Sequence, residues 1–103
     1  MIKTAILVPI ADNNGAIFEP SDHRWVMTEA VARFGGITRE GIVEGQWAED
    51  AQVYEDRLLR LVIALSSWQQ IPAWLTFVEE IRVRFRQISL YGEIAGVPEI
   101  FSG

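Results

Sequence analysis

The order in which two hydrophobic periodicities follow each other constrains the fold of this chain more than any other feature. Four segments place apolar side chains at alternate positions, which predicts strands because successive residues of a strand point to opposite faces. These segments are residues 2–10, 37–47, 53–65 and 88–94. Apolar residues recur at helical spacing from Pro20 to about Phe34 and from Ser67 to about Arg86. The predicted order of elements is therefore βαββαβ.

Each predicted helix has one apolar stripe and recognisable end signals. Ser21 and Asp22 suit the start of the first helix, Gly35-Gly36 its end, and Pro72 the first turn of the second helix. The stripes consist of His23, Met27, Ala30, Val31 and Phe34, and of Ile71, Trp74, Leu75, Val78, Ile81 and Phe85. Both stripes are covered if the helices pack on one face of an antiparallel sheet. The sequence thus predicts one α+β domain over residues 1–103, a ferredoxin-like βαββαβ sandwich.

Two connections are expected to be irregular. Residues 48–51 lie between the second and third strand patterns, which predicts a hairpin loop. Gly96-Val97-Pro98 follows the last strand pattern and predicts its end, because glycine and proline interrupt regular structure. Ile100 and Phe101 would then form a short apolar tail.

The sheet face away from the helices is predicted to be apolar. It carries Ala5, Leu7, Leu58, Val62, Ala64 and Tyr91. A solvated face of an antiparallel sheet is normally polar, and burying apolar surface yields roughly 25 cal/mol per Å². We therefore expect a homo-oligomer, at least a dimer through the open sheet face. The alternative is that the chain's own loops or tail cover this face.

Aromatic side chains outside the predicted core provide further interface candidates. Trp25 falls opposite the apolar stripe of the first helix, and Phe101 lies in the predicted tail. Because aromatic residues dominate binding hot spots, these two and Phe77 would be the anchors if the chain were one subunit of a hetero-complex.

Composition argues against several classes of function. The net charge is −5, which disfavours nucleic acids and anionic membranes, and the third strand lacks the stacking aromatics of RNA-recognition domains. No apolar run approaches the ~20 residues of a membrane span. With one histidine, no cysteine and no calcium-loop spacing at the acidic pairs 49–50 and 55–56, we expect no metal and no cofactor. The absence of cysteine fits a cytoplasmic protein.

His23 is the only histidine and so the natural candidate for general acid–base catalysis near neutral pH. It lies on the core-facing stripe at the first turn of its helix, where a histidine more often bonds a backbone carbonyl. An enclosed pocket with His23 beside a second polar group would favour an enzyme. A filled core with His23 bonded to the backbone would favour a binding module.

Four other side chains are candidates for a ligand pocket: Arg39, Trp47, Tyr54 and Tyr91. Trp47 and Tyr54 flank the hairpin loop. They form either an aromatic wall for a flat ligand or a cross-strand pair that holds the hairpin. Arg39 lies on the second strand and would contact either a polar ligand or only solvent.

Three short motifs suggest a family. Trp25, then Phe34-Gly35-Gly36 with Thr38, then Gly45-Gln46-Trp47 before an apolar third strand, resemble a small ferredoxin-like bacterial domain family of unknown function over residues 18–65. This resemblance implies the fold and no catalytic residue. The strand order also looks similar to the dimeric α/β-barrel group, which pairs sheet to sheet and includes monooxygenases and isomerases.

The sequence as a whole favours a homo-oligomeric binding or interaction module, with a small molecule as one candidate ligand. The alternative is a small cofactor-independent enzyme of the dimeric barrel type, with His23 as general base.

Overall fold

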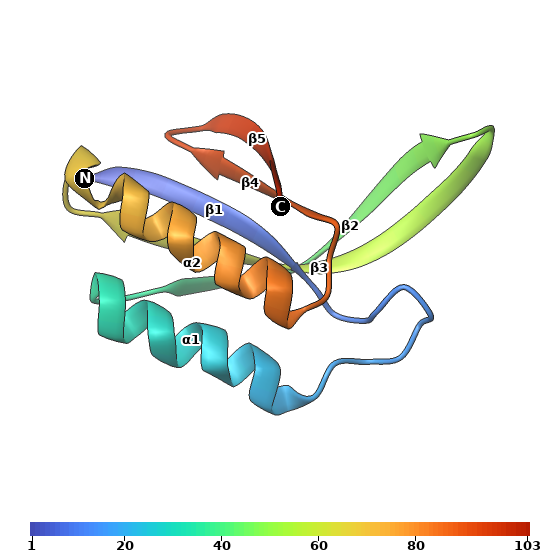
Figure 1. The fold of residues 1–103 in the computed structure, drawn as a ribbon, viewed down its shortest axis with the longest axis horizontal. Coiled ribbons are helices and arrows are strands. Elements are labelled where there is room, and N and C mark those ends of the chain that lie inside the picture. The colour runs from blue at the N-terminus through green and yellow to red at the C-terminus, as the bar shows by residue number, and fades with distance from the viewer.

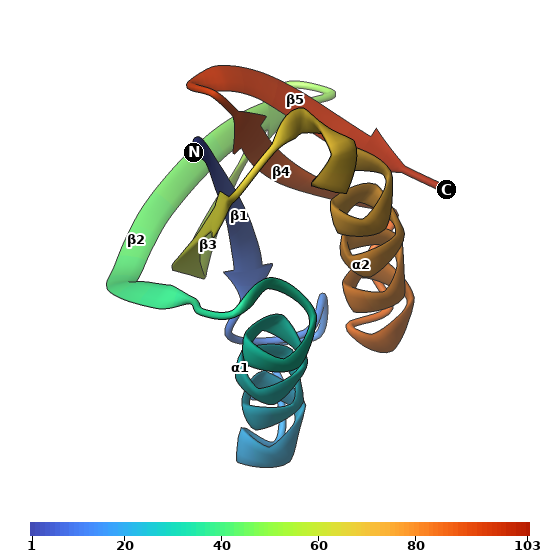
Figure 2. The ribbon, with the colours of Figure 1, turned by 90° about the vertical axis from the view of Figure 1, so that its left-hand side faces the viewer.

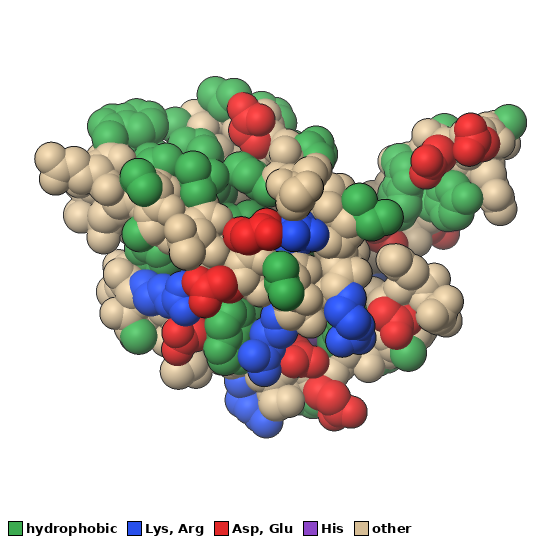
Figure 3. All heavy atoms as spheres, in the orientation of Figure 1, with side chains coloured by type: hydrophobic (Ala, Val, Ile, Leu, Met, Phe, Trp, Pro, Cys, Tyr) green, Lys and Arg blue, Asp and Glu red, His purple; other side chains and the backbone are tan.

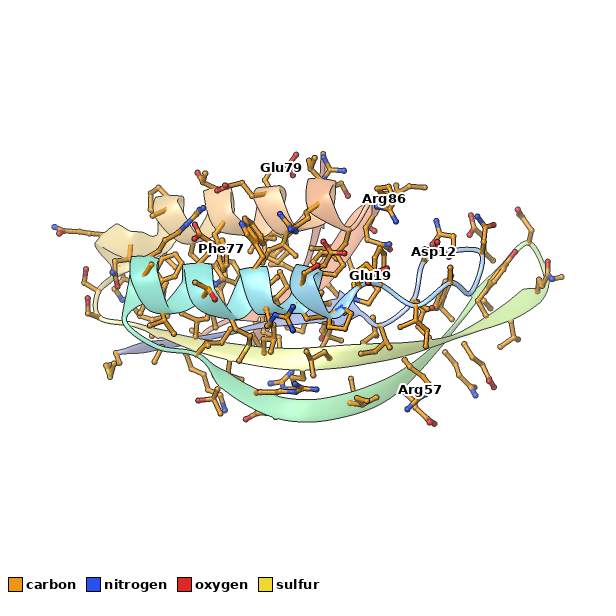
Figure 4. All side chains as sticks on the ribbon, turned by 90° about the horizontal axis from the view of Figure 1, so that it is seen from below. Asp12, Glu19, Arg57, Phe77, Glu79 and Arg86 are labelled. Atoms are coloured by element: carbon orange, nitrogen blue, oxygen red, sulfur yellow. The ribbon has the colours of Figure 1, made fainter.

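The computed structural model describes all residues from Met1 to Gly103. Its elements are β1 (Ile2–Pro9), α1 (Pro20–Phe34), β2 (Thr38–Glu49), β3 (Gln52–Leu65), a short 3₁₀ turn (Trp68–Gln70), α2 (Ile71–Arg84), β4 (Ser89–Ile94) and β5 (Val97–Ser102). The two helices lie side by side (Figures 1 and 2), and both are on the same side of β2 and β3 (Figure 4). The predicted ferredoxin-like α+β fold is confirmed.

The sheet has five antiparallel strands in the order β2-β3-β1-β4-β5. The central strand is β1, which pairs with β3 on one side and β4 on the other. All four predicted strands are present, and each lies within a few residues of its predicted position. The fifth strand is an addition that the sequence analysis did not foresee.

The prediction of a C-terminal tail was wrong, because a tight turn reverses the chain after β4. Ala95 and Gly96 have φ angles of 53° and 81°, as a two-residue type I′ hairpin requires. After this turn β5 pairs with β4 along its whole length. Pro98 is compatible with this position because β5 is an edge strand, where a missing backbone N–H need not interrupt a ladder.

The core lies between the sheet and the helices. On the sheet it consists of alternate residues of β1 and β3: Ile2, Thr4, Ile6, Val8, Leu59, Leu61, Ile63 and Leu65. The helix α2 covers them with Trp74, Phe77, Val78 and Ile81. The one buried polar side chain of this layer, Thr4, donates its hydroxyl to the carbonyl of Ile63 at 2.7 Å. The layer therefore leaves no buried hydroxyl without a partner.

The helix α1 is rotated relative to the predicted stripe. Its fully buried residues are Val26 and Ala30, whereas Val31 is 54% exposed. Trp25, expected on the outer face, is half-buried because its ring lies 5.9 Å from that of Phe77 on α2. The packing of α1 against α2, as well as against the sheet, turns the helix away from the face that periodicity alone selects.

The hairpin of β2 and β3 extends beyond the rest of the sheet. The strand β1 pairs with β3 only from Leu58 to Leu65, and beyond this ladder residues 44–57 pair with each other, except that the carbonyl of Arg57 also accepts a hydrogen bond from the N–H of Ile10. We call residues 44–57 the arm. The arm projects from the body of the molecule (Figures 1 and 3), whose longest dimension is 41 Å. Its turn is shorter than the predicted loop, because Asp50 and Ala51 alone reverse the chain, with φ of 51° and 63°.

Candidate functional site

The sheet surface away from the helices, which we call the open face, has an arginine near its centre. Arg60 on β3 donates from Nε to Glu40 Oε1 at 2.8 Å and from Nη1 to Glu93 Oε2 at 2.7 Å. All three side chains are partly exposed. The two carboxylates raise the pKa of Arg60, chiefly through the hydrogen bond that Arg60 donates to Glu93. The open face therefore has an ion-paired group at its centre, Arg60 with its two carboxylates, and largely apolar residues around it. We call this group the ionic centre.

This ion pair reaches across β1. Arg60 and Glu93 belong to the two strands that flank β1, and Ala5 on β1 lies directly opposite both Val62 and Glu93. The small alanine side chain leaves room for the two long side chains to meet above it. As a result Ala5 and Val62 are only 3% and 9% exposed within one chain. Leu7 and Leu58 are half-buried and Ala64 is exposed, so these three contribute the more accessible apolar surface at the centre of the open face.

A small hollow adjoins the ion pair. It is lined by Lys3, Thr4, Ala5, Arg60, Glu93 and Gly96, and its volume is about 120 Å³. Pockets for small organic molecules usually measure roughly 300–1,000 Å³. The hollow is thus too small to enclose such a ligand within one chain.

Two of the ligand-pocket candidates meet on the arm. Trp47 and Tyr54 are directly opposite on β2 and β3, and their rings stack at 5.4 Å with an interplanar angle of 20°. They face the same side as the open face, because alternate residues of a strand share a side and Val43–Leu58 is the corresponding pair nearer the body. Trp47 is 45% and Tyr54 40% exposed, so both rings remain accessible.

The other two ligand-pocket candidates lie elsewhere. Tyr91 is on the open face but on β4, across β1 from Arg60. Tyr54 precedes Arg60 by six residues on β3, which separates the arm aromatics from the ionic centre by roughly 20 Å. Arg39 is exposed beside the bulge of β2 and lies opposite Leu61, whose side chain is on the helix side. One chain therefore does not gather the four candidates into a single pocket.

His23 lies at the edge of the core and bonds the backbone. Its Nε2 is 3.0 Å from the carbonyl oxygen of Pro9, and its ring lies 5.1 Å from that of Phe85 and 6.5 Å from that of Phe18. An imidazole that donates to a carbonyl and packs against two phenyl rings holds the chain after β1 against α1. This is the arrangement that the sequence analysis associates with a structural histidine.

The aromatic interface candidates are engaged within their own chain. Phe101 on β5 packs edge-on against Trp74 of the core, with ring centroids 5.4 Å apart. Trp25 carries the guanidinium of Arg84 over its ring at 4.7 Å, and Arg84 also bonds Asp22. Both rings therefore have packing partners within their own chain while remaining partly exposed.

Sequence analysis missed three residues of the candidate site: Arg60, Glu93 and Asp56. Arg60 is a polar residue within the apolar run of β3, and Glu93 is an outward residue of β4. Only the strand order of the sheet shows that these two side chains can meet. Asp56 lies on the arm opposite Gly45 and on the same side as Trp47 and Tyr54. An isolated charge on the side of a strand that also carries exposed aromatics is the signal that could have identified it.

Known structures share this fold. A phage SAM lyase in complex with S-methyl-5′-thioadenosine matches with a TM-score of 0.73 and 17% identity, over 99% of this chain and 88% of that chain. A phage SAM lyase in the apo state matches with a TM-score of 0.64 and 16% identity, over 99% and 87%. The divalent cation tolerance protein of Thermus thermophilus gives 0.57 and 16%, over 97% and 80%. Identities this low establish similarity of fold alone.

No family model matches this chain, and no curated protein matches its sequence. The resemblance deduced from the short motifs is therefore supported only as a small ferredoxin-like fold. Neither helix is both long and apolar enough to cross a lipid bilayer.

Proposed function

We propose that this chain is the protomer of a homo-oligomeric binding module in which the arm of one copy packs against a second copy. The observation that carries the proposal is the arm itself. An isolated two-stranded hairpin is at best marginally stable in water, because it has no third strand or helix to pack on. Residues 44–57 are such a hairpin, and neither helix covers them. A second copy would supply the missing cover.

The exposed side chains of the arm support this proposal. Trp47 and Tyr54, on one side of the arm, are 45% and 40% exposed, and Val53, on the other side, is 64% exposed. The arm holds none of the buried core. An apolar surface that projects from the body usually marks an interaction site. The open face is the complementary surface that we favour, since it combines accessible apolar residues with an ionic centre, as non-obligate interfaces do.

A ligand site between copies follows from the same arrangement. The hollow beside Arg60 is small, and the arm aromatics are too far from it within one chain. If the arm of one copy approaches the open face of another, an aromatic wall and an ionic group come together in one place. This arrangement would provide both elements of a small-molecule site, an apolar wall and a few fixed polar groups.

Light scattering with two matched variants tests the assembly. The expected mass of the unaltered protein at micromolar concentration is two or more times that of the 11.7 kDa chain. Val53→Asp on the arm should shift the mass towards that of one chain. Ile88→Asp, at a residue that is 85% exposed outside the arm, should not. A mass of one chain for the unaltered protein contradicts the proposal. The function favoured in that case is a subunit of a hetero-complex.

A second candidate function is an enzyme that acts on SAM, as the similar phage protein is named a SAM lyase. The observation in its favour is a TM-score of 0.73 over 99% of this chain. In the expected cleavage the sulfur keeps the electron pair of its bond to the γ-carbon. The neutral S-methyl-5′-thioadenosine is released while the carboxylate oxygen of the amino-acid part closes on that carbon to form a lactone. This cleavage needs no separate nucleophile or cofactor, because the carboxylate of SAM itself replaces the departing sulfur.

Incubation with SAM and mass spectrometry of the products tests this second candidate. S-methyl-5′-thioadenosine and an equal amount of the lactone are the expected products. SAM that remains intact, apart from the loss seen in buffer alone, contradicts it. The third candidate, an enzyme with His23 as general base, gains no support from the bond between His23 and the carbonyl of Pro9.

A further inference from the structure

At Gly45 no side chain covers the sheet surface of the arm. This residue lies between Val43 and Trp47 on the open-face side of β2. An added Cβ would find one heavy atom within 4 Å, Leu58 Cδ1 at 3.7 Å. The φ of Gly45 is not in the left-handed region, so the backbone does not require glycine here. The absence of a side chain therefore leaves accessible space beside the Trp47 ring.

A free carboxylate borders this space. Asp56 is the direct cross-strand partner of Gly45, so its side chain rises from the same side of the arm. It belongs to none of the six ion pairs of the chain. Neighbouring protein atoms partly desolvate the carboxyl of Asp56 and raise its pKa, although the residue is exposed. A cation beside it would restore the lost charge stabilisation.

The stacked aromatic pair forms the next wall. Trp47 and Tyr54 are one step further along the same side of the arm, and both rings are accessible. The faces of aromatic rings carry negative potential and attract cations within about 6 Å, most strongly for tryptophan. The net charge of the arm adds to this negative potential, because residues 44–57 contain five carboxylates and a single arginine.

We propose that the space above Gly45 binds a small organic cation, a quaternary ammonium or sulfonium group, between the Trp47–Tyr54 pair and Asp56. An organic cation fits better than a metal ion, because calcium takes six to eight oxygen ligands, and the two carboxylates on this side of the arm, Asp56 and Glu49, lie at opposite ends of the Trp47–Tyr54 pair. Alkyl groups on the cation would contact the rings and Leu58. The inference goes beyond the proposed assembly and needs no cleavage reaction.

Choline and its uncharged isostere 3,3-dimethyl-1-butanol are the probes. They have nearly the same shape, so a difference in binding reports the positive charge. Titration of the full chain, followed through the indole N–H signal of Trp47 in ¹H–¹⁵N spectra, should show choline binding at least about fivefold more tightly. Trp47→Phe assigns the signal, and the signal of buried Trp74 reports that each sample is folded.

Three variants localise the site. Asp56→Asn should weaken choline binding by about two- to fivefold, whereas Glu55→Gln, on the other side of the arm and with the same change in charge, should not. Gly45→Val should abolish binding by filling the space while every polar group stays in place.

Equal binding of choline and its isostere, or equal effects of Asp56→Asn and Glu55→Gln, overturns the proposal. The same holds if choline leaves the Trp47 signal unmoved up to the solubility of the probe. Light scattering of the same samples keeps this result separate from the assembly. A multimer that ignores choline refutes the cation site alone, and a single chain that binds choline refutes the assembly alone.

Discussion

Replacing Gly92 with alanine tests the packing that the fifth strand creates. A Cβ at this position would lie 2.7 Å from the carbonyl oxygen of Ala5 and 2.9 Å from Cε2 of Phe101. The oxygen belongs to the backbone of the central strand, which hydrogen bonds hold on both sides, so it cannot turn away as the end of a side chain could. The extra methyl must therefore push β4 away from β1 or move the Phe101 ring off Trp74.

Overpacking of this kind costs about 1–3 kcal/mol of unfolding free energy. Alanine recovers part of it, since glycine in a strand is roughly 0.5–1 kcal/mol less favourable than alanine. The expected net loss is about 1–2 kcal/mol. In a domain of this size each kcal/mol moves the thermal midpoint by roughly 4–8 °C, so Gly92→Ala should melt about 5–15 °C lower.

Thermal unfolding by circular dichroism at one fixed protein concentration measures this shift, because assembly makes the midpoint depend on concentration. Gly45→Ala is the matched control, since it is also a strand glycine but an added Cβ there meets only Leu58 at an ordinary contact distance. We expect Gly45→Ala to match or exceed the stability of the unaltered protein. If Gly92→Ala also does so, the close packing of β4, β1 and β5 is refuted.

Three further predictions concern the polar contacts of Arg60, His23 and Glu80. Arg60→Met should lower the unfolding free energy by about 1–2 kcal/mol, more than Glu93→Gln, because it removes both charged hydrogen bonds of the open face; equal effects would contradict this. His23→Phe should cost about 1 kcal/mol, and His23→Gln, which keeps a donor, should cost less. Arg33 lowers the pKa of Glu80 through a hydrogen bond. The hydrogen bond between Arg33 and Glu80 therefore stabilises the fold fully above the unfolded pKa of Glu80, about 4.3, and this stabilisation is lost as the pH falls below that value. In denaturant melts, Glu80→Gln should lower the unfolding free energy by under about 1 kcal/mol at neutral pH and leave it unchanged in acid.

The element order could be predicted because each strand and helix of the body buries one side. Alternation along Ile2–Pro9 and Leu58–Leu65 follows directly from contact with the helices, and helix ends at Pro20 and Gly35 follow from local backbone preferences. The fifth strand could not be predicted in this way. It is short, lies on an edge, contains Pro98, and depends on a turn at Ala95 that has no strong local signal.

The candidate site was harder to predict because it depends on register and on long side chains. The two-residue turn at Asp50 and Ala51 places Asp56 opposite Gly45, and alanine at positive φ gives no warning of such a turn. The reach of Arg60 over Ala5 depends on which strands flank β1, and not on any periodicity. Trp47 and Tyr54 were predicted to flank the hairpin loop, as a wall for a ligand or as a cross-strand pair, because the two strand patterns meet at this loop.

Amide hydrogen exchange of the arm tests the central claim most directly. The hydrogen-bonded backbone amides of residues 45–56 should exchange slowly at high protein concentration, because a second copy covers the hairpin. On dilution the same amides should exchange much faster. Amides of β1 should stay protected at both concentrations, since the helices of their own chain cover them. Exchange of the arm that is rapid and independent of concentration would contradict the account.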